Sequence, residues 1–331
     1  MFIIEDYSTA VIFCIITMFC WGSWANTQKL AASNWRFELF YWDYVIGILS
    51  FSLVFAFTFG SVGDGGRSFL ENIAQADNSN ILSAFSGGLV FNIANILLGA
   101  AIAIAGMAVA FPVGIGLALV IGVIVNYNAN PEGNQLYLFG GVTLITFAIL
   151  LNANAYHKMR SGNKGGSSKG LILSIVAGVL MGFFYKYVAA AMFPVFTNPE
   201  PGKLSPYTSV VLFAAGVFLS NFIFNTWLMR RPFVGAPVSY SDYFKGGLKN
   251  HITGIMGGAI WCMGMSFSIL ASDKAGPAIS YGLGQGATVI AALWGIFVWK
   301  EFKNAPKDTN AILNIMLLCY VIGLGLIIAA R

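Results

Sequence analysis

Residues 82–126 read LSAFSGGLVFNIANILLGAAIAIAGMAVAFPVGIGLALVIGVIVN and contain no Asp, Glu, Lys or Arg. A membrane-spanning helix needs about 20 mostly apolar residues. The stretch is roughly twice that length, so it predicts two spans, 82–104 and 107–127, joined by a very short connector. We expect these two spans to form a tight antiparallel hairpin.

The whole 331-residue chain has the same character, with 57% hydrophobic and only 9% charged residues. Soluble globular proteins carry about 25% charged residues. This deficit cannot cover a surface exposed to water, which excludes a soluble enzyme. The 38 glycines suit closely packed membrane helices. The net charge of +5 is better explained by basic connectors than by a nucleic-acid-binding surface.

Eight further apolar stretches predict an all-α polytopic membrane protein with ten transmembrane helices. We expect residues 1–156 to form a first five-helix repeat and residues 170–331 a second, joined by a basic connector, 157–169. The predicted spans are 8–31, 39–60, 82–104, 107–127, 136–156, 170–193, 208–229, 251–272, 276–299 and 310–330.

The basic residues predict the orientation. The connectors between spans one and two, five and six, seven and eight, and nine and ten hold thirteen of the 18 Lys and Arg residues, against four on the other side. The positive-inside rule places the richer side in the cytoplasm. Both termini are therefore expected outside (periplasmic), and the membrane is expected to be the cytoplasmic (inner) one. The acidic start, Glu5-Asp6, does not fit a signal peptide, so the first span is expected to be retained.

Three short motifs recur in the same order in the two halves. Because each half has five spans, the two halves must have opposite orientations in the membrane. Inverted repeats of this kind are typical of secondary transporters, with the substrate site near the bilayer midplane. The pairs are 21–26 with 181–186, Gly87-Gly88 with Gly257-Gly258, and Gly114-Ile115-Gly116 with Gly282-Leu283-Gly284.

Several motifs in the first half carry a family resemblance: Cys20-Trp21-Gly22-Ser23-Trp24, Asp43-Tyr44, Phe57-Thr58-Phe59-Gly60, Phe69-Leu70, Gln75, Gly87-Gly88, Asn92, Asn95 and Gly99. With the ten-span layout, they resemble the drug/metabolite transporter superfamily, and within it the ureide permeases and the glucose/ribose porters. The resemblance implies two inverted five-helix halves and uptake of a small polar metabolite by proton symport. Plant ureide permeases have a long central loop with a Walker-type sequence, which residues 162–169 do not fit.

Aromatic and amide residues in the spans are the predicted substrate contacts. Flat aromatic faces can stack on sugars or heterocycles, and neutral amides can bind hydroxyl or ureido groups. The alternative for each is structural, because such side chains also pack or tie helices together in membranes. The candidates are Trp21, Trp24, Asn26, Asn92, Asn95, Asn225, Trp261 and Gln285.

Two charged residues in the spans are candidates for proton coupling. Lys186 lies deep in span six, where it could contact substrate or pair with a carboxylate, or else extend to the outer headgroups. Asp43 lies near the cytoplasmic start of span two, where it could carry a proton or simply stabilise the helix N-terminus. His157 and His251 lie near span ends, which disfavours an imidazole relay.

The predicted function is secondary active transport of a small neutral polar solute, taken up with protons by alternating access. A pentose or hexose is the first choice, and a ureide or nucleobase the second; an exporter of amino acids or other metabolites is the alternative. The first span has no carboxylate beyond Asp6, which disfavours a cationic-drug exporter. No connector clusters Asp, Glu, His or Cys, so neither an enzyme nor a metal or other cofactor is expected. The expected partners are the solute, protons and the lipid bilayer, without nucleic acid.

Overall fold

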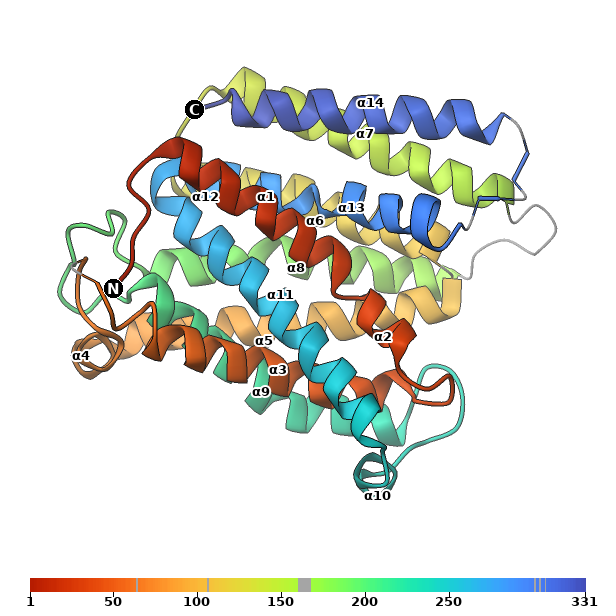
Figure 1. The fold of residues 1–331 in the computed structure, drawn as a ribbon, viewed down its shortest axis with the longest axis horizontal. Coiled ribbons are helices and arrows are strands. Elements are labelled where there is room, and N and C mark those ends of the chain that lie inside the picture. The colour runs from red at the N-terminus through yellow and green to blue at the C-terminus, as the bar shows by residue number, and fades with distance from the viewer. Residues whose placement is uncertain (64, 106, 160–167, 301, 304, 307) are drawn as a thin grey trace.

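The computed structural model describes residues 1–331 except 64, 106, 160–167, 301, 304 and 307. Within that part the chain is helical, and its long helices run roughly parallel in one bundle (Figure 1). The helices are α1 (Tyr7–Ser23), α2 (Asn26–Leu30), α3 (Phe37–Phe57), α4 (Phe69–Gln75), α5 (Asn78–Ala105), α6 (Met107–Ala129), α7 (Gln135–Met159), α8 (Ser168–Ala191), α9 (Pro206–Arg230), α10 (Tyr240–Phe244), α11 (Leu248–Ala275), α12 (Pro277–Gln285), α13 (Ala287–Leu293), a π-helical turn (Trp294–Val298) and α14 (Thr309–Ile328).

The predicted polytopic membrane architecture is confirmed. In the described part of the chain, eight helical segments are long and apolar enough to cross a membrane, and they coincide with eight of the ten predicted spans. At the other two predicted spans lie α1, with 17 residues, and α6, of which Val113–Ala129 is the apolar part with described side chains.

Two predicted spans, 8–31 and 276–299, contain a local interruption of the helix that the sequence did not predict. The first is interrupted at Trp24 and Ala25, where the next turn is held by bonds from Thr27 N–H to Trp24 O and from Gln28 N–H to Ala25 O. The second is interrupted at Gly286, whose N–H donates to Leu283 O. Bonds between residues three apart tighten the backbone locally, and glycine weakens a helix interior.

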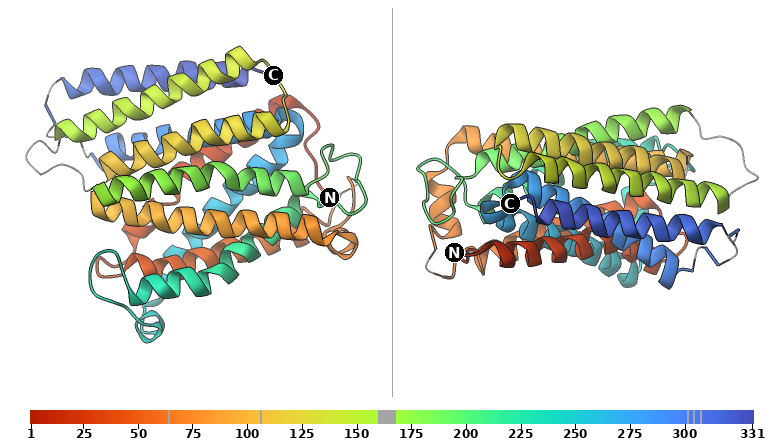
Figure 2. Two further views of the ribbon diagram at one scale, coloured as in Figure 1. Left: turned by 180° about the vertical axis from the view of Figure 1, so that it is seen from behind. Right: turned by 90° about the horizontal axis from the view of Figure 1, so that it is seen from above.

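The main helix contacts form matching sets. α5 packs along α8 and α9, while α11 packs along α1 and α3. α6 packs against α8, and α12 and α13 pack against α1. α7 and α14 lie side by side at one edge of the bundle (Figures 1 and 2). The contacts of α5 with α8 and α9 therefore match those of α11 with α1 and α3. The contact of α6 with α8 matches that of α12 and α13 with α1.

Glycines bring two of these helix pairs unusually close. A Cβ on Gly88 would collide with the Phe213 carbonyl oxygen across the α5–α9 contact. A Cβ on Gly258 would collide with the Tyr44 carbonyl oxygen across the α11–α3 contact. Small residues at these crossings allow the backbones to approach, as is typical of membrane helix pairs.

Both termini lie at one end of the bundle, together with α4, while α2 and α10 lie at the other end (Figure 1). The described parts of the connectors predicted to be cytoplasmic, which include α10, lie at the second end, which we call the basic end. The first end is called the opposite end.

Candidate functional site

An inner cavity of about 100 Å³ lies among α1, α5, α8, α11 and the α12–α13 segment. Aromatic rings form much of its wall: Trp21, Trp24, Phe91, Phe184 and Trp261. Asn95, Gln285 and Thr288 add polar groups. Among its described lining residues none is ionisable, so the cavity offers flat apolar faces with a few neutral hydrogen-bonding groups, which suits a small uncharged solute.

Trp21 is fixed in the wall by helices from the other half of the chain. Its ring stacks on Trp261, with centroids 5.8 Å apart and planes 14° apart, and its indole N–H donates to the Trp261 carbonyl oxygen at 3.1 Å. Gly264 and Gly284 lie directly against the ring, because a Cβ at either position would come within 2.8 Å of it. The absence of side chains at these glycines is what lets Trp21 pass between α11 and α12.

The polar side of the cavity continues into a buried network. Asn95, which lines the cavity, donates to the Tyr41 hydroxyl at 3.2 Å. Tyr41 donates to the Asn92 side-chain oxygen at 2.9 Å, and Asn92 donates to the Ser220 hydroxyl at 2.9 Å. This chain joins α3, α5 and α9. Asn92 therefore ties helices together and does not line the cavity.

A larger cavity of about 630 Å³, which we call the vestibule, adjoins the inner cavity toward the basic end. The two share the lining residues Trp24, Asn95, Leu98, Thr288 and Ala291. Much of the rest of the vestibule is lined by α2, by the 31–36 connector, by the basic ends of α5 and α7 and by the π-helical turn. A solute entering from the basic end could therefore reach the aromatic wall.

Asn26 lies at the side of the vestibule, with both ends of its amide engaged. Its oxygen accepts from the Trp299 indole at 2.7 Å, and its nitrogen donates to the Ser23 carbonyl at 3.1 Å. The Lys29 ammonium lies 4.4 Å from the Trp299 ring centroid. These contacts tie α2 to the end of the π-helical turn, so Asn26 acts here as a link between helices.

Both helix interruptions border these cavities. Trp24, at the first, lines both of them. Gln285 and Ala287, on either side of Gly286, line the inner cavity. Interrupted helices at a central site are a recurring feature of secondary transporters, where they leave backbone groups for ligands. The sequence analysis missed both interruptions, although Gly282-Leu283-Gly284 and Gly286 were a visible signal.

The structure brings together only part of the predicted substrate-binding set. Trp21, Trp24, Asn95, Trp261 and Gln285 meet at the inner cavity.

The remaining candidates lie elsewhere. Asn225 is buried and donates to the Glu38 carbonyl at 2.9 Å, outside the cavity linings. Lys186 is exposed on α8 and is not among the lining residues of either cavity, because its position on the helix points away from α5 and α6. The predicted contact of Lys186 with substrate has no geometric support in this conformation.

Asp43 is buried, with a 1% exposed side chain, and lies at the basic end of α3 rather than in the cavity wall. Its carboxylate oxygens lie 2.9 and 3.0 Å from His251 Nδ1, and Tyr243 donates to the carboxylate at 2.6 Å. Burial and the Asp43 carboxylate raise the pKa of the Tyr243 phenol, so this side chain acts as a donor. The sequence analysis missed both partners of Asp43.

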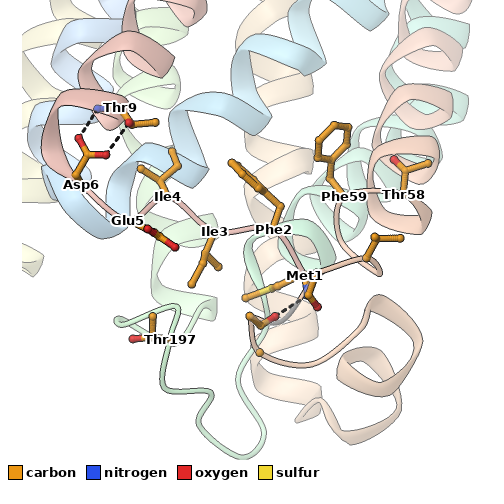
Figure 3. A pocket seen from close by; sticks show the side chains of 14 residues that line it. Met1, Phe2, Ile3, Ile4, Glu5, Asp6, Thr9, Thr58, Phe59 and Thr197 are labelled. Atoms are coloured by element: carbon orange, nitrogen blue, oxygen red, sulfur yellow. Dashed lines mark hydrogen bonds between the residues drawn. The ribbon is translucent and has the colours of Figure 1, made fainter.

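A third pocket, of about 920 Å³, lies at the opposite end (Figure 3). Its lining consists mostly of residues 1–6, 58, 59, 62, 63, 65 and 66. The Asp6 carboxylate in this lining accepts two bonds from Thr9. It shares no lining residue with the inner cavity or the vestibule.

Phe13 packs on Phe267 with centroids 4.6 Å apart, and Phe55 lies 6.0 Å from the same ring. These rings pack α1, α3 and α11 together at this end.

In the described part of the chain, no three His, Cys, Asp or Glu side chains lie close enough to hold a metal ion.

Comparisons with known proteins show which proteins this chain is similar to. A family profile described as "Ureide permease" matches residues 40–169 and 160–330. The chain is 21% identical to "Ureide permease 1" of Arabidopsis thaliana over 100% of this chain and 99% of that protein. It is 24% identical to "Glucose uptake protein GlcU" of Bacillus subtilis over 68% of each chain. One solved crystal structure, 13% identical, matches 96% of each chain with a TM-score of 0.57 and shares the fold.

Proposed function

The chain belongs to the ureide permease family, and from this premise we propose that it takes up a small neutral polar solute by symport with protons. As a member of this family it is a multi-pass membrane transporter rather than an enzyme. The proposal adds the class of solute, the coupling ion and the direction of transport.

The observation that carries the proposal is the inner cavity. Its walls combine the Trp21–Trp261 stack with the neutral groups of Asn95, Gln285 and Thr288. Such a surface favours solutes that present a flat or C–H-rich face and several hydroxyl or amide groups. Sugars and ureides both have these features, and the proteins named among the relatives are ureide permeases and sugar uptake proteins. We place a pentose or hexose first and a ureide or nucleobase second.

We infer that transport follows alternating access between two inverted five-helix repeats, residues 1–156 and 170–331. The matching helix contacts and the paired glycine crossings support this arrangement. With ten spans and the basic connectors in the cytoplasm, the vestibule opens inward across the cytoplasmic membrane. The packed rings of Phe13, Phe55 and Phe267 would then separate the site from the outside.

We assign proton coupling to Asp43. It is a buried carboxylate within a predicted span, and such groups are rare and usually functional. Lys186, the other coupling candidate, is exposed on α8.

The test is uptake into proteoliposomes with an imposed inward proton gradient. The panel comprises radiolabelled pentoses, hexoses, allantoin, uracil and nucleosides. We expect one class to accumulate above its equilibrium level and to lose that accumulation when the gradient is collapsed. Asp43→Asn should abolish accumulation but keep solute exchange. Glu71→Gln is the matched control, because Glu71 is an exposed carboxylate on α4 at the opposite end. Downhill efflux alone, with no member of the panel accumulated, would favour an exporter.

A further inference from the structure

The cluster of Asp43, His251 and Tyr243 at the basic end is in direct contact with the 31–36 connector, which borders the vestibule. Asp43, His251 and Tyr243 come from α3, α11 and α10, and they meet through bonds of 2.6 to 3.0 Å. Trp35, which lines the vestibule, packs on two of them: its ring centroid lies 5.4 Å from that of His251 and 6.4 Å from that of Tyr243. The cluster therefore touches the wall of the vestibule through one aromatic side chain.

The connector that carries Trp35 is fixed on one side to α11 and on the other to the segment between α9 and α10. Ala32 N–H donates to the Asn250 side chain at 2.9 Å, beside His251. Arg36 donates to the carbonyl oxygens of Val234 and Ala236 at 2.9 and 2.7 Å. The buried Trp35 indole N–H has no hydrogen-bond partner among the described residues, so packing against the cluster holds this ring.

We propose that Asp43, His251 and Tyr243 form a proton-binding site whose occupancy sets the position of the 31–36 connector, and with it the opening of the vestibule. The inference deepens the proposed function, on which it rests, by giving Asp43 two partners and a mechanical output. The Asp43 carboxylate is the group that must bear the negative charge. His251 and Tyr243 position this carboxylate and share the proton with it.

The arrangement favours the protonated state of the pair. With a neutral imidazole, the cluster holds one buried negative charge, which is costly even with two donors. A proton on His251 turns the contact into a neutral ion pair with the same geometry. His251 is 22% exposed and Asp43 only 1%, so solvent reaches the cluster from the histidine side. Proton loss should therefore favour a rearrangement in which water reaches Asp43.

The neighbouring charged side chains do not take part in the proton exchange of this cluster. Among the described titratable side chains, those that bond to Asp43 are Tyr243 from α10 and His251 from α11. Arg36 is already paired with Glu38 at 2.7 Å. Lys245 and Lys249 are exposed to solvent.

The experiment measures the vestibule mouth directly, without solute or gradient. Spin labels at Ser33→Cys and His157→Cys, both exposed and on opposite sides of the mouth, report one distance by pulsed electron paramagnetic resonance in nanodiscs. A Cys319→Ser background removes the partly exposed thiol, since the other three cysteines are buried. Spectra are compared at about pH 5.5 and about pH 8.5, on either side of the usual histidine range.

We expect one dominant distance at the lower pH and a second population, displaced by about 5 Å or more, at the higher pH. Asp43→Asn, which is neutral at every pH, should show the low-pH distribution at both values. His251→Gln, which cannot take up the proton, should show the high-pH distribution at both. Glu71→Gln should respond as the parent does.

Two results would overturn the proposal: a parent distribution that does not change with pH, or a full pH response in the Asp43→Asn variant. If Asp43→Asn fails to fold, Tyr243→Phe replaces it. Losing a donor to the carboxylate should move the pH midpoint of the change in distance to a higher value. An unmoved midpoint would count against the cluster. Since no solute is present, failure here leaves proton-driven uptake to be judged separately in proteoliposomes.

Discussion

Trp21 on α1 and Trp261 on α11 form a stacked pair that is locked by a hydrogen bond from the Trp21 indole to the Trp261 backbone, 3.1 Å long. The pair continues to Phe213, whose ring lies 5.8 Å from that of Trp261. Because the two tryptophans come from different halves of the chain, movement of one half against the other must change this wall of the cavity.

Removing the Trp21 ring should weaken solute binding. An aromatic contact contributes about 1 kcal/mol beyond its buried area, which corresponds to roughly fivefold in affinity. We expect Trp21→Ala to raise the KM for uptake by at least that factor, and Trp21→Phe to raise it less, because an aromatic ring is kept although the N–H and part of the aromatic surface are lost. Trp227→Ala is the control, since Trp227 is half-exposed on α9, away from both cavities. An equal increase in the control would contradict a specific role for Trp21.

Adding a methyl group beside the Trp21 ring should also weaken solute binding. The Cβ of Gly264→Ala would lie 2.7 Å from Trp21 Cδ1, and that of Gly284→Ala 2.8 Å from Trp21 Cζ3. Overpacking of this kind costs about 1–3 kcal/mol and displaces the ring. We expect a higher KM for both variants but no further increase when Gly284→Ala is combined with Trp21→Ala, because the ring that its Cβ would meet most closely is then gone. Gly325→Ala, with open space around its Cβ, should match the parent.

The opposite end depends on a buried amide for its stability. Asn72 on α4 is fully buried, donates to the Lys203 carbonyl at 3.1 Å and accepts from Ser205 N–H at 2.8 Å. Asn72→Ala leaves the Ser205 N–H unpaired and removes one of the two donors to the Lys203 carbonyl, which still accepts from Gln75, at a cost of about 1–3 kcal/mol. Scanning fluorimetry in detergent should show a lower unfolding midpoint for this variant. Glu71→Gln, on the exposed side of the same helix, should melt with the parent; a matching loss there would point to α4 as a whole.

The sequence predicted the long apolar helices and part of the site, because both depend on local patterns. Hydropathy alone locates the spans, and buried aromatic or amide residues such as Trp21 and Asn95 stand out within them. The Asp43–His251 contact could not be predicted, since it joins residues 208 positions apart through tertiary packing. The break at Gly286 was also missed, because a glycine in an apolar stretch is equally compatible with a continuous helix.

Lys186 illustrates a further limit, since hydropathy gives the depth of a residue but not the face of the helix on which it lies. Depth suggested a substrate contact, whereas the structure places the side chain on the exposed surface of α8. We therefore expect Lys186→Ala to transport at nearly the parental rate. By contrast, Asn95→Ala should lose most transport, because it removes a polar group of the cavity wall and also the partner of Tyr41.

Initial uptake rates for the two variants, normalised to the amount of folded protein in the vesicles, decide between these interpretations. A conserved circular-dichroism spectrum and unfolding midpoint must accompany the loss in Asn95→Ala, since the Tyr41 network also ties helices together. Asn95→Asp, of nearly the same shape, should still lose uptake of a neutral solute, because it introduces a charge into a cavity wall without ionisable groups among its described residues. If Lys186→Ala instead loses transport while Asn95→Ala retains it, the substrate pathway follows the exposed face of α8 and not the Trp21–Trp261 wall.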